Sequence, residues 1–162
     1  MADRIAVMRA GGLAQVAPPR EIYEHPASRW VAEFIGDVNL FEGTILAVDA
    51  NETLVETAAM GKLRLGPGHA AHRGDRVTIA IRPERIVIAR AGEAAAAPNA
   101  TGGILVDTAY LGGVSIYKVR LDRGGIVQVA NANVGRGSNA VGRPGGRVTL
   151  SFGTDAGVVL TQ

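Results

Sequence analysis

The segment Gly74-Asp75-Arg76-Val77-Thr78-Ile79-Ala80-Ile81 returns 71 positions later as Gly145-Gly146-Arg147-Val148-Thr149-Leu150-Ser151-Phe152. In both copies, branched apolar residues alternate with small or polar ones, which is the period-two pattern of a β-strand with one buried face. The following pair Val87-Ile88 matches Val158-Val159 at the same spacing. This repeat predicts two related β-lobes within one chain.

A second pair of matching segments lies nearer the start of each half. Gly43-Thr44-Ile45-Leu46 matches Gly102-Gly103-Ile104-Leu105 at a spacing of 59. Because this spacing is shorter than 71, the second half must hold about 12 extra residues, a length typical of a surface loop. We place them at residues 131–142.

Period-two segments fill the chain from Phe41 onward, and glycine pairs such as Gly112-Gly113 supply turns between them. The predicted strands include Val77–Ile81, Ile86–Ile88, Gly103–Leu111, Val114–Leu121, Ile126–Ala130 and Arg147–Phe152. Closing such short strands into a small barrel covers edges that an open sheet would expose. We therefore predict a mainly β fold, with a β-barrel built from the two lobes.

The first 37 residues follow a different pattern. Arg4–Val16 indicates a hairpin, Pro19–Glu24 a short helix, and Ser28 an N-cap for a second helix that ends at Ile35. We expect Trp30, Val31, Phe34 and Ile35 to form one apolar face of that second helix. An isolated hairpin is marginal in water, so this one needs a packing partner.

The expected domain organisation follows from these segments. Residues 1–37 form a hairpin-and-helix unit, and residues 38–162 form the barrel domain. Its two lobes span about residues 38–90 and 101–162, joined by a linker at 91–100 whose small residues and Pro98 offer little to bury.

Composition excludes several classes of function. The 162 residues carry 17 basic and 15 acidic side chains, and a net charge of +2 is too small to attract nucleic acid strongly. The chain has no cysteine, so disulfides, thiolate metal sites and cysteine nucleophiles are excluded. A nucleic-acid-binding barrel would also need aromatic platforms, and few aromatic residues fall in the predicted barrel.

Catalytic and cofactor motifs are not supported either. The one Gly-Lys pair, Gly61-Lys62, lacks the remaining residues of a phosphate-binding loop. Gly135–Ala140 fits the loose dinucleotide pattern, but the nearby Pro144 opposes the helix that this pattern requires. His69 and His72 have no third metal ligand nearby, and Glu84 and Asp155 occupy equivalent turns of the two lobes. We expect no catalytic residue, no bound cofactor and no metal site.

Several segments, taken in order, resemble the end of the nucleotide-binding domain of an ABC importer ATPase and the transport-associated OB (TOBE) domain that follows it. The segments that carry this resemblance are Ala2–Met8, Gln15-Val16, Pro19–Pro26, Val31–Gly36, Asn39–Gly43 and Ile81–Glu84. The spacing from Phe34 to Phe41 is similar to that of the spermidine/putrescine branch. Ala17-Pro18 departs from the usual Gly-Thr, so the first helix lacks a hydroxyl cap.

The resemblance implies an OB-like β-barrel and a C-terminal regulatory and dimerisation region of a polyamine importer. The family's ATP-hydrolysing motifs lie upstream and are absent here, so this chain alone would not be an enzyme, and ATP and Mg would belong to the full-length subunit. The expected partners are a second copy and transmembrane permease subunits, with no nucleic acid. The expected location is cytoplasmic, peripheral at the inner face of the bacterial plasma membrane through the permease.

Candidate contacts follow from this hypothesis and its alternatives. For dimerisation, the candidates are Tyr110, Tyr117, Asn131 and Asn133. An alternative is a small-molecule or oxyanion-sensing barrel, for which the candidate ligand or regulatory contacts are Arg82, Glu84 and Arg120, although an ion pair of Arg82 with a carboxylate would give it a structural role. A freestanding OB-type nucleic-acid binder is the third alternative.

Overall fold

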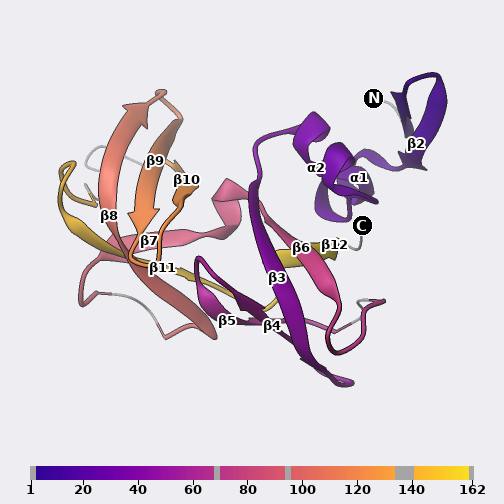
Figure 1. The fold of residues 1–162 in the computed structure, drawn as a ribbon. Coiled ribbons are helices and arrows are strands. Elements are labelled where there is room, and N and C mark those ends of the chain that lie inside the picture. Colours follow the sequence, from indigo (N-terminus) through magenta and orange to yellow (C-terminus); the bar gives the residue numbers. More distant parts are fainter. Residues whose placement is uncertain (1–2, 68–69, 94–95, 134–140, 161–162) are drawn as a thin grey trace.

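The computed structural model of the chain describes residues 3–67, 70–93, 96–133 and 141–160 and is mainly β, which confirms the predicted fold class (Figure 1). Two helices, α1 and α2, lie between an N-terminal hairpin and two five-stranded sheets. The elements are β1 (Ile5–Arg9), β2 (Gly12–Ala17), α1 (Pro19–Glu24), α2 (Arg29–Ile35), β3 (Asn39–Val48), β4 (Thr53–Thr57), β5 (Gly61–Leu65), β6 (Arg76–Ile81), the 3-10 turn η1 (Pro83–Arg85), β7 (Val87–Arg90), β8 (Asn99–Tyr110), β9 (Val114–Leu121), β10 (Ile126–Ala132), β11 (Arg147–Phe152) and β12 (Gly157–Leu160).

The two five-stranded sheets exchange their last strands. The first sheet has the order β12-β6-β3-β4-β5, and the second has the order β10-β9-β8-β11-β7. After β6, the chain crosses through η1 and pairs β7 with β11; after β11, it crosses back and pairs β12 with β6. Each half of the chain therefore completes the sheet of the other half, and the two sheets fold as one body.

One hydrophobic cluster fills the space enclosed by both sheets. Its fully buried residues come from equivalent positions of the two halves, such as Ile45 with Leu105 and Val55 with Val119. Leu65 and Ile79 add further buried side chains from the first sheet. The period-two pattern of the sequence is thus the alternation between this core and the outer faces.

The structure corrects the spacing of the second pair of matching segments. Gly43 pairs with Val77, and Gly103 pairs with Val148, so Gly103 rather than Gly102 is the equivalent of Gly43, at a spacing of 60. The predicted spacing of 59 was wrong because a one-residue slip would turn the core residue Leu105 to the outer face.

The extra residues of the second half lie in two places, not one. The hairpin β3–β4 ends with the pair Val48–Thr53, whereas β8–β9 continues for two further pairs, Ala109–Ile116 and Tyr110–Ser115. The remaining extra residues lie between β10 and β11, partly in residues 134–140, outside the described part of the chain. The β8–β9 extension (residues 109–116) is called the hairpin tip below.

The N-terminal hairpin pairs with itself and packs on the helices. Val7 and Ala17 of the hairpin join Ile22 of α1 and Val31 of α2 in a small separate cluster. Ser28 accepts a hydrogen bond from the Val31 amide, as predicted for the N-cap of α2. The predicted apolar face of α2 was partly wrong: Val31 and Ala32 are buried, but Phe34 is 62% exposed and stacks on Trp30.

Candidate functional site

Arg82 holds both helices against the barrel. Its side chain is 7% exposed, and its Nη1 donates to the backbone oxygens of Ala32 and Gly36 at 3.0 Å and of Asp37 at 3.1 Å. Its Nη2 donates to the backbone oxygen of Tyr23 at 3.3 Å. The last carbonyls of a helix have no partner within the helix and carry partial negative charge, so a guanidinium satisfies them well. The residue after β6 thereby fixes the ends of α1 and α2.

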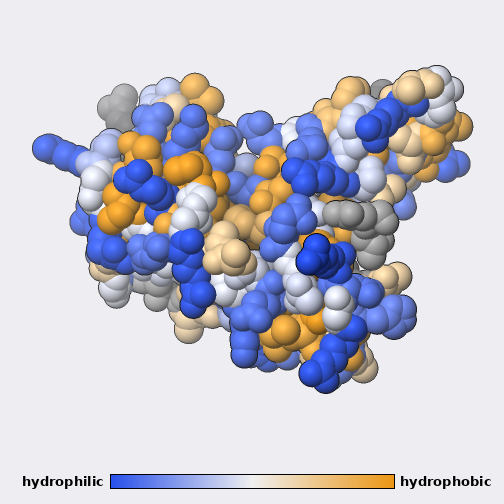
Figure 2. All heavy atoms as spheres, viewed as in Figure 1, coloured by the Kyte–Doolittle hydropathy of each residue, from blue (hydrophilic) through white to orange (hydrophobic). Residues whose placement is uncertain are grey.

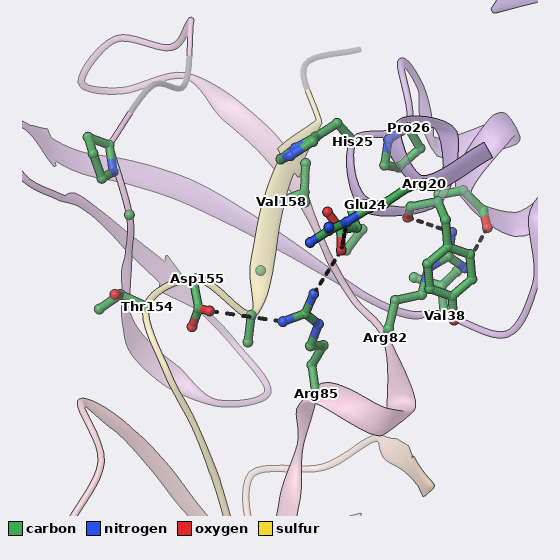
Figure 3. A pocket seen from close by; sticks show the side chains of 17 residues that line it. Arg20, Glu24, His25, Pro26, Val38, Arg82, Arg85, Thr154, Asp155 and Val158 are labelled. Carbon is green, nitrogen blue, oxygen red and sulfur yellow. Dashed lines mark hydrogen bonds and ion pairs between the residues drawn. The ribbon is translucent and has the colours of Figure 1, made fainter. Parts of the chain in front are cut away.

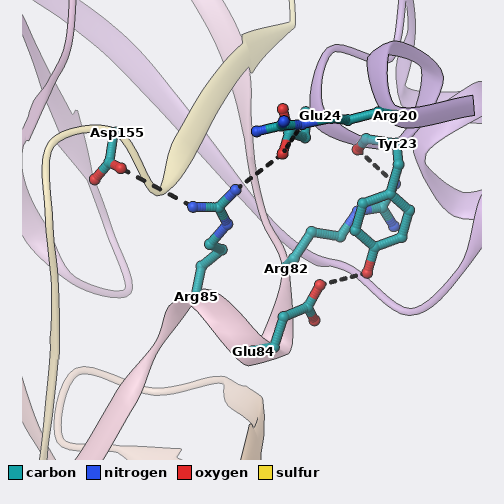
Figure 4. A network of polar contacts seen from close by, with 7 residues as sticks. All are labelled: Arg20, Tyr23, Glu24, Arg82, Glu84, Arg85 and Asp155. Atoms are coloured by element: carbon teal, nitrogen blue, oxygen red, sulfur yellow. Dashed lines mark hydrogen bonds and ion pairs between the residues drawn. The ribbon is translucent and has the colours of Figure 1, made fainter. Parts of the chain in front are cut away.

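Tyr23 and Glu84 surround this arginine. The Arg82 guanidinium lies 4.3 Å from the centre of the Tyr23 ring, and the Tyr23 hydroxyl donates to a carboxylate oxygen of Glu84 (Figure 4). Burial, reinforced by the hydrogen bond to Glu84 and its negative charge, raises the pKa of Tyr23 above its ordinary value. Arg82 thus meets a ring face and backbone oxygens rather than the Glu84 carboxylate.

Arg85 links α1 to the second crossover between the sheets. Its Nη2 lies 3.4 Å from a carboxylate oxygen of Glu24 on α1, and its Nη1 lies 4.0 Å from one of Asp155, in the β11–β12 turn. Glu24 also pairs with Arg20 at 3.1 Å. These contacts border a cavity of about 450 Å³ between α1, β6 and β12 (Figure 3). The charged side chains that line the cavity pair with one another, and these ion pairs connect α1, η1 and the β11–β12 turn.

The remaining candidates lie in the second sheet. Tyr110, Ser115 and Asn131 are opposite one another on β8, β9 and β10. Tyr110 is 72% exposed, but Tyr117 lies in the core at 7% and presents little surface. Asn133 binds the hairpin tip, because its amide nitrogen Nδ2 donates to Gly112 and its Oδ1 accepts from Ser115. Arg120 is exposed on β9 and does not line the cavity that contains Arg82.

Apolar side chains gather on the surface of the second sheet and of the N-terminal hairpin (Figure 2). On the hairpin tip, Tyr110, Leu111 and Val114 are exposed by 72%, 67% and 36%. On the N-terminal hairpin, Met8 and Leu13 are exposed by 57% and 67%.

The structure can be searched for metal sites and membrane-spanning helices only within the described residues. Within the described ranges, no three His, Cys, Asp or Glu side chains come close enough to hold a metal ion, and no helix is long and apolar enough to cross a membrane. His69 and the whole glycine-rich segment at 135–140 lie outside those ranges.

Comparison with known proteins identifies the family. The model of the TOBE domain matches residues 79–160, which begin within β6 and end at β12. The chain belongs to the TOBE domain family. The family resemblance found in the sequence is thereby confirmed.

Curated relatives extend the match beyond the TOBE region. The putrescine transport ATP-binding protein PotG of Escherichia coli K12 is 35% identical over 99% of this chain. The spermidine/putrescine import ATP-binding protein PotA of Rubrobacter xylanophilus is 38% identical over 94% of it. The chain spans only 43% and 39% of these relatives. These matches fit the TOBE-containing C-terminal region of a polyamine importer ATPase.

A solved structure shares the fold. The cytoplasmic molybdate-binding protein ModG, solved with molybdate bound, superposes with a TM-score of 0.63 over 76% of this chain and 96% of that chain. The sequence identity is 16%, so the similarity concerns the fold alone.

Proposed function

We propose that this chain is the C-terminal regulatory and dimerisation region of the ATP-binding subunit of a polyamine-type ABC importer. The observation that carries the proposal is the extent of the match. The PotG similarity covers 99% of the chain, so it includes the hairpin and helices that precede the TOBE match at residues 79–160. A TOBE barrel with another function would not need this N-terminal unit.

The hairpin tip supports a dimerisation role. It is the part of the second half that extends beyond the first half, and it places Tyr110, Leu111 and Val114 in solvent. Clustered exposed apolar side chains are typical of protein–protein contacts, and tyrosine is enriched in them. We propose that two copies meet through this tip, with Asn131 beside it and Asn133 holding its shape.

The junction at Arg82 supports a regulatory role. In the proposed subunit, the hairpin and helices belong to the nucleotide-binding part, so Arg82, Tyr23 and Glu84 join that part to the barrel. A movement of either part would have to displace these contacts. ATP, Mg and the permease would be bound by the full-length subunit on the cytoplasmic side, and the chain alone would neither bind nor hydrolyse ATP.

Sedimentation of the free chain tests the dimerisation proposal. We expect wild type to self-associate, and Tyr110→Ser combined with Leu111→Ser to raise the dissociation constant at least about tenfold, as for loss of a central apolar anchor. The matched control is Val48→Ser, since Val48 is 40% exposed on the shorter hairpin of the first half. A monomeric wild type, or equal weakening by the control, would contradict the proposed interface.

A further inference from the structure

Two asparagine side chains join the sheets in the same way. Asn39 of β3 donates from Nδ2 to the backbone oxygen of Gln128 and accepts at Oδ1 from the Gln128 amide, both at 2.8 Å. Asn99 of β8 makes the same pair of bonds with Arg64, at 2.8 and 2.7 Å. Each side chain therefore pairs with an edge strand of the opposite sheet as another strand's backbone would.

These two amide pairings occupy equivalent positions. Asn39 and Asn99 each stand four residues before the equivalent glycines Gly43 and Gly103. Both side chains are nearly inaccessible, at 8% and 2% exposure, and both partners lie on outer strands of their sheets, β10 and β5. The two bonds at each site contribute to closing the barrel.

Only the Asn39 pairing connects to the helices. Asn39 follows directly the connection at Gly36 and Asp37, whose backbone oxygens are bound by Arg82. The Asp37 carboxylate also accepts from Nε2 of Gln128, at 3.1 Å. The short connection from α2 to β3 is thus bonded to the Arg82 junction on one side and to β10 on the other. Asn99, in contrast, follows the connection at residues 91–98 between β7 and β8.

The strand held by Asn39 leads to the hairpin tip. β10 runs from Ile126 to Ala132, and the next residue, Asn133, donates from its backbone amide to Gly113 at 2.9 Å and from its side chain to Gly112 at 2.7 Å. A shift of β10 would therefore strain the hydrogen bonds that Asn133 makes with Gly112 and Gly113 of the hairpin tip.

We propose that Asn39 is a positioning residue that couples the α1–α2 unit to the hairpin tip through Gln128 and β10, whereas Asn99 serves only to close the barrel. The biological role of this coupling rests on the proposed regulatory function, for which it would provide a structural route. The physical coupling itself is a property of this chain as a monomer, and it can be measured whether or not two copies associate.

Amide hydrogen exchange in the monomeric chain tests the proposal. In Asn39→Ala and Asn99→Ala, the Gln128 and Arg64 amides respectively should exchange about tenfold faster, because each loses its acceptor. The coupling is read elsewhere, at the Leu111 amide, which donates to Val114, and at the Asn133 amide. We expect these tip amides to exchange at least about threefold faster in Asn39→Ala and to be unchanged in Asn99→Ala, after correction for global unfolding.

The matched pair makes the result decisive. Tip amides that respond equally to both substitutions, or to neither, would overturn the proposal, because then the tip does not sense which amide pairing is broken. If Asn39→Ala does not fold, Asn39→Asp keeps an acceptor for the Gln128 amide but replaces the donor by a carboxylate oxygen that faces the Gln128 backbone oxygen, so this second bond is lost. The same tip amides should then also exchange faster than in wild type, and unchanged tip amides in a folded Asn39→Asp chain would again overturn the proposal. Failure of dimerisation in sedimentation would leave these exchange rates unaffected.

Discussion

The two halves of the barrel have the same core and different surfaces. Equivalent glycines, asparagines and core residues give both halves one backbone design, including the reciprocal exchange of β7 and β12. The second half has the longer hairpin with exposed apolar side chains. The first half has Arg82 where the second has Gly153, at the same spacing of 71 that relates the repeats. Residues that are equivalent in the two halves therefore build the barrel. Residues that differ between the halves provide the contacts of the barrel with the helices and the exposed surface of the hairpin tip.

This division explains why Arg82 binds the helix ends and its equivalent in the second half, Gly153, does not. The crossover after β6 faces α1 and α2, so a long cationic side chain there can satisfy the carbonyls at their ends. The crossover after β11 faces solvent more freely and needs only a compact turn, in which Asp155 is 83% exposed. The two crossovers meet at the Arg85–Asp155 contact, at the edge of the cavity.

The largest expected effect on stability comes from substituting the equivalent glycines Gly43 and Gly103. A Cβ on Gly103 would lie 2.6 Å from the backbone oxygen of Arg120 and from Cγ1 of Val119, so Gly103→Ala should destabilise the chain by about 2–3 kcal/mol. A Cβ on Gly43 meets Cγ1 of Val55 at 2.7 Å and the Glu56 oxygen at 3.0 Å, so Gly43→Ala should cost about 1–2 kcal/mol. Urea unfolding measures both.

Gly102→Ala is the control for this comparison. Its Cβ would meet Oδ2 of Asp122 at 2.6 Å and Nη2 of Arg147 at 3.2 Å, which are the far ends of exposed, movable side chains. We expect a cost below about 1 kcal/mol. A larger loss from Gly102→Ala than from Gly103→Ala would show that the repeats are aligned one residue away from the register described here.

Much of the fold could be predicted from the sequence because local patterns specify it. The alternation at Val77–Ile81 and the Ser28 cap before α2 depend on neighbouring residues, and the structure has both elements there. The register of the second half could not be predicted in the same way. Gly102 and Gly103 are adjacent and chemically identical, and only contacts distant along the chain distinguish the two positions, such as the pairing of Gly103 with Val148 and its packing against Val119.

The site was less predictable because its partners are distant along the chain. Arg82 and Glu84 were identified as candidates, but Tyr23 lies 61 positions from Glu84, and no local pattern joins them. The Asn39–Gln128 pairing spans 89 positions. The shared Asn-x-x-x-Gly spacing at Asn39 and Asn99 is the one sequence signal that could have indicated an equivalent role for the two asparagines.

A smaller effect on stability tests the contact between Glu84 of the first crossover and Tyr23 of α1. Tyr23→Phe removes the hydrogen bond to Glu84 and should cost about 0.5–1 kcal/mol near neutral pH. Because the folded chain holds the pKa of Tyr23 above its ordinary value, the neutral phenol contributes its stability fully below pH 10. That contribution is lost as the pH rises through the raised pKa.

The measurement is the difference in unfolding free energy between wild type and Tyr23→Phe from pH 8 to pH 11. The wild-type advantage should be constant at first and should decrease above pH 10. Tyr110→Phe serves as the control, since Tyr110 is 72% exposed and its substitution should cost almost nothing at neutral pH. An advantage that grows with pH would contradict the assignment of Tyr23 as a donor to Glu84.

The smallest expected effect concerns the ion pairs of Arg85, where the two crossovers meet. Arg85→Gln should cost below about 0.5 kcal/mol, because the arginine is 43% exposed and water screens both pairs. A double-mutant cycle should give a larger coupling with Glu24→Gln than with Asp155→Asn, since Glu24 is nearer, at 3.4 against 4.0 Å, and less exposed, at 28% against 83%. Both couplings should diminish in 1 M salt. The reverse order would mean that Arg85 joins the two crossovers more strongly than it joins the barrel to α1, and the contrast between a helix-binding first crossover and a free second one would then not hold.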